Sequence, residues 1–403
     1  LADDAELTPR PAEVLRDGLA AAADRHLGDQ GPGPADPIAA IRAVRALRTR
    51  ELIRVACADV LHLAGESAPP PAKALGRGPY PTEGDNRGPF LTPGALSAVT
   101  DATLGAALRV ARATQPAMPG LRFAVIGMGR LGGYEMNYLS DADVLFVYDP
   151  PPGVPEDAAS AAAAAIAEEL RRLLGMPAPD PPLGVDADLR PEGRQGPLVR
   201  SLSAYAQYYA RWSKVWEAQA LLRARYVCGD ADLGAEFEAM AAPVRYPERG
   251  LSRDQVVEIR RIKARVEAER LPRGADPATH TKLGRGGLAD VEWAVQLLQL
   301  RHAGARPELR CTRTLDALAA ARDAGLVDAA DAAAMTAGWT LAARVRNALM
   351  LVRGRAGDQL PRHGVELAGV VRLLGGDDPG EFLDHYLRTA RRCRAAVERV
   401  LDG

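Results

Sequence analysis

Apolar residues recur three and four positions apart along most of the chain, which is the spacing of amphipathic helices. In the N-terminal part this pattern predicts helices over residues 1–30, 39–65 and 96–113. From residue 202 onward it predicts helices over 202–227, 251–270, 287–303, 314–325, 331–353, 364–374 and 379–401. Residues 65–93 are rich in proline and glycine and poor in apolar residues, so we expect a loop there.

Residues 121–200 follow a different pattern. Short apolar runs at 123–126 and 144–148 have the length of strands and are bounded by glycine, aspartate and proline. A helical pattern covers 155–175. In "GVDADLRPEG" (184–193) apolar and polar residues alternate strictly, which predicts a strand that projects Asp186 and Asp188 from the same side.

These patterns predict an α+β chain in three segments. We expect an N-terminal helical segment (1–113) that contains the loop at 65–93, an α/β domain (114–230), and an all-helical bundle domain (231–403).

Bulk composition narrows the class of protein. The 51 basic and 52 acidic residues balance, so no overall positive field predicts a nucleic-acid partner. Cys57, Cys228, Cys311 and Cys393 are scattered without metal-ligand spacing, which indicates reduced thiols in a cytoplasmic protein. No apolar run approaches membrane-spanning length. The chain starts at Leu1 rather than methionine, which indicates an excised fragment or a processed start.

Paired carboxylates stand at the head of the second apolar run. Asp141 and Asp143 share one face of the predicted strand because Ala142 points the other way. Two close carboxylates repel each other unless a cation lies between them, and Mg²⁺ prefers carboxylate and phosphate oxygens. Asp186, on a later strand, is the candidate third carboxylate of a two-metal site for displacement at phosphorus.

A glycine-rich turn precedes these carboxylates. "GMGRLGG" (127–133) follows a predicted strand, so its backbone can approach phosphate oxygens, and Ser140 adds a hydroxyl. A dinucleotide-binding turn and a simple tight turn are the alternatives for the glycines, and a solvated strand edge is the alternative for the aspartates. The order of glycine turn, aspartate pair and later strand aspartate favours the nucleotidyltransferase fold of the DNA polymerase β type.

The same residues resemble a known family. "GMGRLGGYEMNYLSDADVLFVY" is similar to the signature of the glutamine synthetase adenylyltransferases, G-M-G-[KR]-x-G-G-x-E-[LM]-x-x-x-S-D-x-D. Three further blocks resemble that family in the same order: "VDADLRPEGRQGPLVRSL", "WEAQALLRAR" and "KLGRGGLADVEWAVQLLQLRHA". The position of Asp188 holds arginine in many relatives, so the sharing of charge between Asp186 and Asp188 stays open.

The resemblance implies one half of a bifunctional enzyme. One half of such enzymes transfers AMP from ATP to a tyrosine of glutamine synthetase, and the other removes it with phosphate to give ADP. A single copy of the signature is present, and its form resembles the C-terminal, adenylyl-transferring half of actinobacterial members. Adenylyl removal, nucleotidyl transfer to another acceptor (as in uridylyl-transferring relatives) and a non-catalytic helical regulatory module are the alternatives.

Site residues are implied position by position. The nucleotide-phosphate loop of the family matches Gly127, Gly129, Gly132, Gly133 and Ser140. Its catalytic metal ligands match Asp141, Asp143 and Asp186, and Arg190 matches an arginine suited to pair with a phosphate. The resemblance further implies ATP as substrate with Mg²⁺, glutamine synthetase as partner, and a PII-type regulator and glutamine as effectors.

Two groups in the later blocks carry weaker predictions. Asp290 and Glu292 are two apart on a predicted helix and therefore lie on different faces, which favours capping or domain-docking salt bridges over a second metal site. Arg223 and Arg225 are either phosphate contacts or ordinary helix-surface arginines.

Overall fold

The computed structural model describes residues 7–27, 35–65 and 91–402. The predicted loop at 65–93 therefore lies almost entirely outside the described residues. Contacts divide the chain into two compact units. The first comprises Leu1–Ala58, Thr92–Met136 and Ser140–Arg245, and the second Asp59–Leu91, Asn137–Leu139 and Tyr246–Gly403. This division differs from the three predicted segments, because most of the N-terminal helical segment groups with the α/β part.

The first unit contains a small mixed sheet. Its strands are β1 (Arg122–Gly127), β2 (Ala142–Asp149), β3 (Val185–Asp186), β4 (Val199–Ser201) and β5 (Arg225–Gly229), in the order β3-β2-β1-β5 with β4 also paired to β2. β1 runs antiparallel to β2 and β5, whereas β3 and β4 run parallel to β2. The strands predicted at 123–126 and 144–148 are confirmed.

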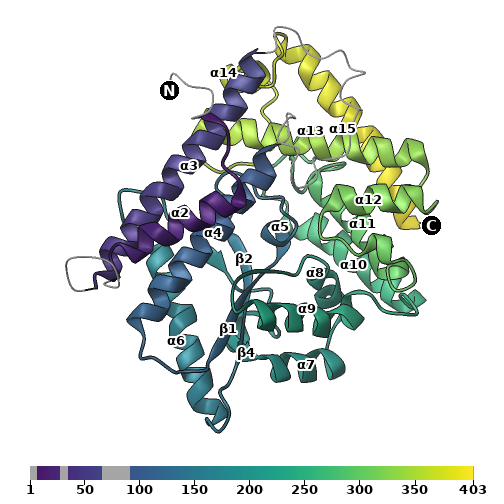
Figure 1. Ribbon diagram of the computed structural model, residues 1–403. Coiled ribbons are helices and arrows are strands. Elements are labelled where there is room, and N and C mark those ends of the chain that lie inside the picture. The colour runs from purple at the N-terminus through teal and green to yellow at the C-terminus, as the bar shows by residue number, and fades with distance from the viewer. Residues whose placement is uncertain (1–6, 28–34, 66–90, 403) are drawn as a thin grey trace. The chain divides into compact units, whose positions relative to one another are not determined.

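Helices cover both faces of this sheet. On one face, alternate residues of β1 and β2 such as Ile126 and Leu145 pack with residues of α7 (Leu202–Arg211) and α9 (Ala231–Arg245). Tyr205 of α7 and Phe237 of α9 meet edge to face there, with ring centroids 5.2 Å apart. The alanine-rich helix α6 (Glu156–Gly175), which matches the prediction at 155–175, packs against β2 and β4 from the other side (Figure 1).

One long predicted helix is wrong. The structure divides residues 202–227 into α7, α8 (Val215–Leu221) and strand β5. α8 starts anew because the side chain of Glu217 accepts the backbone N–H of Lys214 at 2.8 Å. β5 forms because the run from Arg225 to Gly229 pairs with β1, and tertiary pairing outweighs the helical pattern there.

The remaining helices of the N-terminal part agree with the pattern. They are α2 (Ala12–Asp24), α3 (Pro37–Gly65) and α4 (Leu91–Thr114), and a single turn, α5 (Gly129–Gly132), follows β1. α3 and α4 confirm the helices predicted at 39–65 and 96–113.

The described part of the second unit consists mainly of helices, whereas α9, within the predicted bundle segment (231–403), groups with the first unit. Its helices are α10 (Arg253–Arg270), α11 (Leu288–His302), α12 (Thr314–Asp323), α13 (Ala329–Arg353), α14 (Val365–Leu373) and α15 (Pro379–Asp402). Leu349 of α13, Leu367 and Val370 of α14 and Tyr386 of α15 share a buried core. An isolated bridge joins His280 to Gln359.

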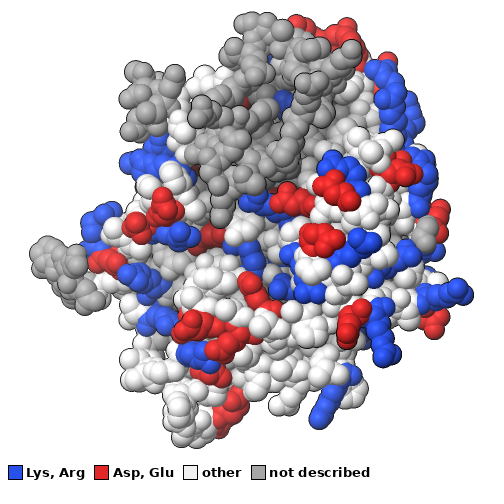
Figure 2. Space-filling model, turned by 45° about the vertical axis from the view of Figure 1, so that its right-hand side comes forward, with Lys and Arg blue, Asp and Glu red and all other residues white. Residues whose placement is uncertain are grey.

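The structure also bears on the predictions about cysteines, surface charge and membrane-spanning segments. All four cysteines are free, and Cys228 and Cys393 are buried. Acidic and basic side chains are interspersed over the described surface drawn in Figure 2, as the balanced composition led us to expect. Among the described helices, none combines the length and the apolar character that a membrane span requires.

Candidate functional site

Carboxylates from two parallel strands meet at one end of the sheet. Asp141 immediately precedes β2, and Asp143 is the second residue of that strand. Asp143 is the register partner of Asp186 on β3. Side chains of register partners project to the same face of a sheet, so both carboxylates lie on the face that carries Leu145. The structure thus brings Asp143 and Asp186, far apart in sequence, side by side.

Glycines let the backbone pass directly against two of these carboxylates. A Cβ atom at Gly129 would overlap Oδ2 of Asp143, and one at Gly184 would overlap Oδ1 of Asp141. Gly129 also has a φ of +50°, a conformation that favours glycine. The sequence predicted a role for Gly129 but missed Gly184, whose only mark was its position just before the strand of Asp186.

The other predicted glycines build the turn itself. Gly127 ends β1, and α5 then closes a single turn in which the N–H of Gly133 donates to the carbonyl oxygen of Gly129 at 3.1 Å. A Cβ at Gly132 would overlap the carbonyl oxygen of Arg223. Ser140, half-buried, directly precedes Asp141. The predicted phosphate loop is therefore a compact turn beside the carboxylates; that it binds phosphate stays a prediction.

The prediction that Asp186 and Asp188 share one face of a strand is wrong. β3 ends at Asp186, whose Oδ1 accepts the backbone N–H of Asp188 at 2.7 Å and so turns the chain out of the strand. Asp188 instead pairs with Arg194, with 2.5 Å between Oδ2 and Nε. Asp186, not Asp188, is therefore the carboxylate aligned with Asp143.

Arg190 holds this loop together. Its buried guanidinium donates to the carbonyl oxygens of Gly196, Ala187 and Arg194 at 3.0, 2.9 and 3.1 Å. These bonds fix the segment that follows Asp186 and occupy donors that a phosphate contact needs. The phosphate-binding role of Arg190 stays a prediction, and the observed geometry favours shaping the loop.

The donor chemistry at this end of the sheet suits magnesium. Within the described residues, no three side chains of the His, Cys, Asp or Glu types are grouped closely enough to form a metal site by themselves. Mg²⁺ commonly takes one or two carboxylates and completes its shell with water and substrate phosphates. The adjacent carboxylates of Asp143 and Asp186, with Asp141 next to them, match that requirement.

Arg223 and Arg225 lie beneath the glycine turn rather than on a helix surface. Nη1 of Arg223 is 2.7 Å from Oε2 of Glu135, and both side chains are about 6% exposed. Nε and Nη2 of Arg225 donate to the carbonyl oxygen of Leu131 at 3.2 and 2.9 Å. Sequence reasoning missed Glu135, although it occupies the fixed glutamate position of the motif.

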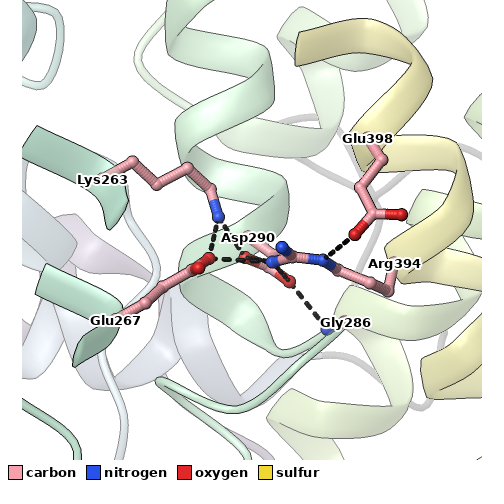
Figure 3. Close-up of polar contacts among 6 residues, drawn as sticks. All are labelled: Lys263, Glu267, Gly286, Asp290, Arg394 and Glu398. Carbon is pink, nitrogen blue, oxygen red and sulfur yellow. Dashed lines mark hydrogen bonds and ion pairs between the residues drawn. The ribbon is translucent and has the colours of Figure 1, made fainter. Parts of the chain in front are cut away.

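Asp290 forms a separate ionic network in the helical unit (Figure 3). Lys263 of α10 donates to Oδ1 of Asp290 at 2.6 Å, Arg394 of α15 lies 3.0 Å from both of its oxygens, and the N–H of Gly286 donates to Oδ2 at 2.7 Å. Glu267 pairs with both cations, and Glu398 lies 2.7 Å from Arg394. Asp290 therefore forms salt bridges, but with partners inside the second unit, so a domain-docking role for them stays a prediction, as does the role of Glu292.

The electrostatics of Asp290 follow from this setting. Burial by itself raises the pKa of the carboxyl group, but the charges of Lys263 and Arg394 and the N–H of Gly286 outweigh it and hold the pKa below its usual range. Asp290 is thus an ionised structural anchor for three helices.

Comparison with known proteins places these features in a family. Residues 92–240 match the sequence model described as glutamate-ammonia ligase adenylyltransferase, and residues 260–401 match one described as GlnD PII-uridylyltransferase. Among similar curated proteins, the bifunctional glutamine synthetase adenylyltransferase/adenylyl-removing enzyme of Streptomyces avermitilis is 52% identical over 402 residues. Those of Streptomyces coelicolor and Nocardia farcinica are 54% and 52% identical over 367 and 400 residues.

These matches cover nearly all of this chain but only part of each relative. The match to the Streptomyces avermitilis protein takes in 98% of this chain but 38% of the relative, and the other two take in 90% and 98% of this chain but 36% and 37% of the relatives. The chain therefore spans somewhat more than a third of the length of these relatives. By sequence, it belongs to the family of bifunctional glutamine synthetase adenylyltransferase/adenylyl-removing enzymes and corresponds to a part of such an enzyme.

Proposed function

We propose that this chain is a nucleotidyltransferase of the DNA polymerase β type that transfers AMP from ATP to a tyrosine of glutamine synthetase. The observation that carries the proposal is the register pairing of Asp143 with Asp186 beside a glycine turn that lies against Asp143. Carboxylates at that spacing are suited to two-metal chemistry at phosphorus, and the turn offers backbone N–H groups to phosphates. The adenylyltransferase match covers this same region.

Each group has a role in the proposed reaction. Asp141, Asp143 and Asp186 would hold Mg²⁺, which neutralises triphosphate charge when bound. The turn at 127–133 binds and orients the triphosphate so that the α-phosphorus faces the acceptor. A carboxylate of the site receives the phenol proton as the tyrosine oxygen forms its bond to the α-phosphorus. The bond from that phosphorus to the bridging oxygen breaks, and pyrophosphate leaves with the electron pair.

The reverse direction is the second candidate. The relatives are named for both adenylyl transfer and adenylyl removal, and this chain spans only part of their length. In removal, a phosphate oxygen attacks the same phosphorus, the tyrosine oxygen leaves, and ADP forms. The same carboxylates and turn serve either chemistry, so the direction depends on the acceptor presented.

One experiment separates the two directions. The chain is incubated with α-labelled ATP and unmodified glutamine synthetase, and separately with adenylylated glutamine synthetase and phosphate, each with and without Mg²⁺. Labelled glutamine synthetase that depends on Mg²⁺ supports transfer. Release of ADP in the second mixture alone assigns removal, and no turnover in either mixture contradicts both candidates.

A matched variant controls for loss of charge on the same strand. Asp149 is the last residue of β2 and pairs with Arg122 at 2.6 Å, at the opposite end from the site. Asp149→Asn is expected to retain turnover, whereas Asp143→Asn is expected to lose it.

The helical unit is the proposed docking part for regulators. Its match to a model named for a PII-uridylyltransferase supports recognition of a PII-type protein, and glutamine is the proposed small effector. Titration of the chain with a PII protein and with glutamine, with AMP transfer as the readout, tests this assignment. Unchanged turnover in both titrations contradicts it.

A further inference from the structure

The glycine turn of the first unit rests on a set of ionised side chains. Asp101 of α4, Glu135 just after the turn, and Arg223 and Arg225 around the start of β5 make up this set, which we call the arginine brace. None of the four belongs to the carboxylates at the head of β2, and the proposed chemistry assigns them no role.

Arg223 and Glu135 form the first limb of the brace. The backbone carbonyl of Arg223 occupies the space where Gly132 would carry a Cβ. The Arg223 side chain pairs with Glu135 at 2.7 Å, and the N–H of Glu135 donates to the carbonyl oxygen of Arg130 at 2.8 Å. One residue thus contacts the turn through its backbone and, through Glu135, fixes the chain that leaves it.

Arg225 forms the second limb. Besides its two bonds to Leu131, its Nη2 lies 2.8 Å from Oδ1 of Asp101, and its guanidinium lies 3.7 Å from the ring centroid of Tyr134. Tyr134 has a φ of +54°, which is uncommon for a residue with a side chain. Arg225 is also the register partner of Gly127, where the turn departs from β1. The limb therefore contacts the start, the middle and the end of the turn.

Stability alone is a poor explanation for this arrangement. Buried ion pairs lose hydration on folding, and well-packed apolar residues of similar volume commonly stabilise a protein at least as well. Apolar residues, however, lack the directional donors that fix the carbonyl oxygen of Leu131 and the cation that lies over the ring of Tyr134. The brace therefore fixes the conformation of the turn beside Asp143.

We infer that Glu135, Arg223, Arg225 and Asp101 are positioning residues that hold the turn at 127–133 in the conformation that receives a nucleoside triphosphate. This inference rests on the proposed function, because it assigns triphosphate binding to the turn. The contacts of these four side chains lead to the turn and to the residues that flank it, so we expect them to act on the affinity for the nucleotide and not on the chemical step.

The test replaces the first limb by apolar residues in the full chain, as Glu135→Leu with Arg223→Met. Calorimetry measures the Kd for ATP with Mg²⁺, AMP transfer to glutamine synthetase gives KM and kcat, and thermal melting gives stability. We expect the Kd and the KM for ATP to rise by about tenfold or more, with kcat within about threefold of the parent and the melting temperature retained. Unchanged Kd and KM in a stable variant overturn the inference.

The matched control is another buried pair of the same unit. Glu51 and Arg54 of α3 lie 3.0 Å apart with side-chain exposures of 2% and 6%, close to those of the first limb. Glu51→Leu with Arg54→Met is expected to leave the Kd for ATP unchanged. An equal rise in Kd for this control contradicts a specific role for the brace.

A second variant decides the matter if the first does not fold. Arg225→Lys keeps a positive charge near Asp101 but loses the two-pronged grip on the Leu131 carbonyl, so the Kd for ATP should again rise. The ATP affinity of the parent chain distinguishes a failure of the brace from a failure of the proposed function. A parent that binds no ATP refutes the proposed function, whereas a parent that binds ATP only as tightly as Arg225→Lys refutes the brace alone.

Discussion

Two aspartate sites, one in each unit, follow glycine pairs in the sequence and differ in their physical surroundings. Asp143 lies on a strand, half-buried, with the backbone of Gly129 against its carboxylate and Asp186 alongside. Asp290 lies in the first turn of a helix, buried, with Lys263, Arg394 and a backbone N–H around it (Figure 3). The first site places two acids side by side on one sheet face, and the second surrounds one acid with two cations.

The difference shows how surroundings decide what a carboxylate can do. An acid balanced by cations has its hydrogen-bonding capacity occupied and anchors structure, whereas adjacent acids on one sheet face attract a cation from outside. Both sites follow glycine-rich blocks, so the glycines do not distinguish them. The secondary structure does distinguish them. Side chains two positions apart lie on the same face of a strand, which has period two, but on different faces of a helix, which has period 3.6.

The largest expected effect comes from removing the charges of the first site. Asp141→Asn with Asp143→Asn should lower AMP transfer by about 10⁴-fold or more, because interactions made in the transition state are lost together. The melting temperature should stay the same or rise slightly, since repulsion between acids is relieved. Transfer and thermal melting are measured on one preparation. Retained transfer would contradict the metal-binding role. A large drop in the melting temperature would show that these aspartates, like Asp290, stabilise the fold.

Asp290→Asn should produce the opposite profile. Removing the buried carboxylate leaves Lys263 and Arg394 with only the more exposed Glu267 and Glu398 as ionic partners, at a cost of up to about 3–5 kcal/mol in the free energy of unfolding. Urea denaturation followed by circular dichroism measures that cost. The affinity for ATP should not change at a temperature where the variant is folded. A variant as stable as the parent would show that the network contributes little.

A single added methyl group should sharpen the contrast at the first site. Gly129→Ala forces a Cβ against Asp143 and also carries the strain of φ +50°, which costs about 1–2 kcal/mol. Gly153→Ala is the matched control, because Gly153 has φ +80° with no described atom within 4 Å of the position that the added methyl group would take. Gly129→Ala should lose at least as much stability as Gly153→Ala, but only Gly129→Ala should lose transfer. Equal activities would show that the contact with Asp143 is unimportant.

Low pH should remove the contribution of Asp290 to the stability of the folded chain. Its folded-state pKa lies below that of the unfolded chain, so its stabilising effect is present above about pH 4, the ordinary range for aspartate, and is lost as the pH falls through the folded-state value. The stability difference between the parent and Asp290→Asn should therefore shrink on acidification. Urea midpoints from neutral pH downward measure it, and a difference that grows in acid would reverse the assignment.

Much of this architecture could be predicted because it follows local rules. The helices from α10 to α15 and the strands β1 and β2 have clear periodicity, and the glycine turn and Asp143 lie close in sequence. One failure is local, because the alternation after Asp186 gives way to a turn fixed by three bonds from Arg190. The other concerns a contact between distant segments, because β5 carries a helical pattern but pairs with β1.

The brace was missed for the same reason. Arginine on a helical pattern is ordinarily a surface residue, and only the β5 pairing places Arg225 beneath the turn. Asp101, its ionic partner, is on a helix that precedes the sheet in sequence. Charge pairs between such distant segments leave no periodic trace in a single sequence.

The parallel pairing of β2 with β3 has a consequence for the order of folding. The hairpin of β1 and β2 closes over a short connection and already contains the glycine turn and Asp143. Asp186 arrives only after the crossover through α6 has closed, a step with a larger loop entropy and an added repulsion between acids. A chain in which this crossover has not closed therefore lacks the Asp186 half of the proposed site, and the proposed nucleotide chemistry requires the complete crossover.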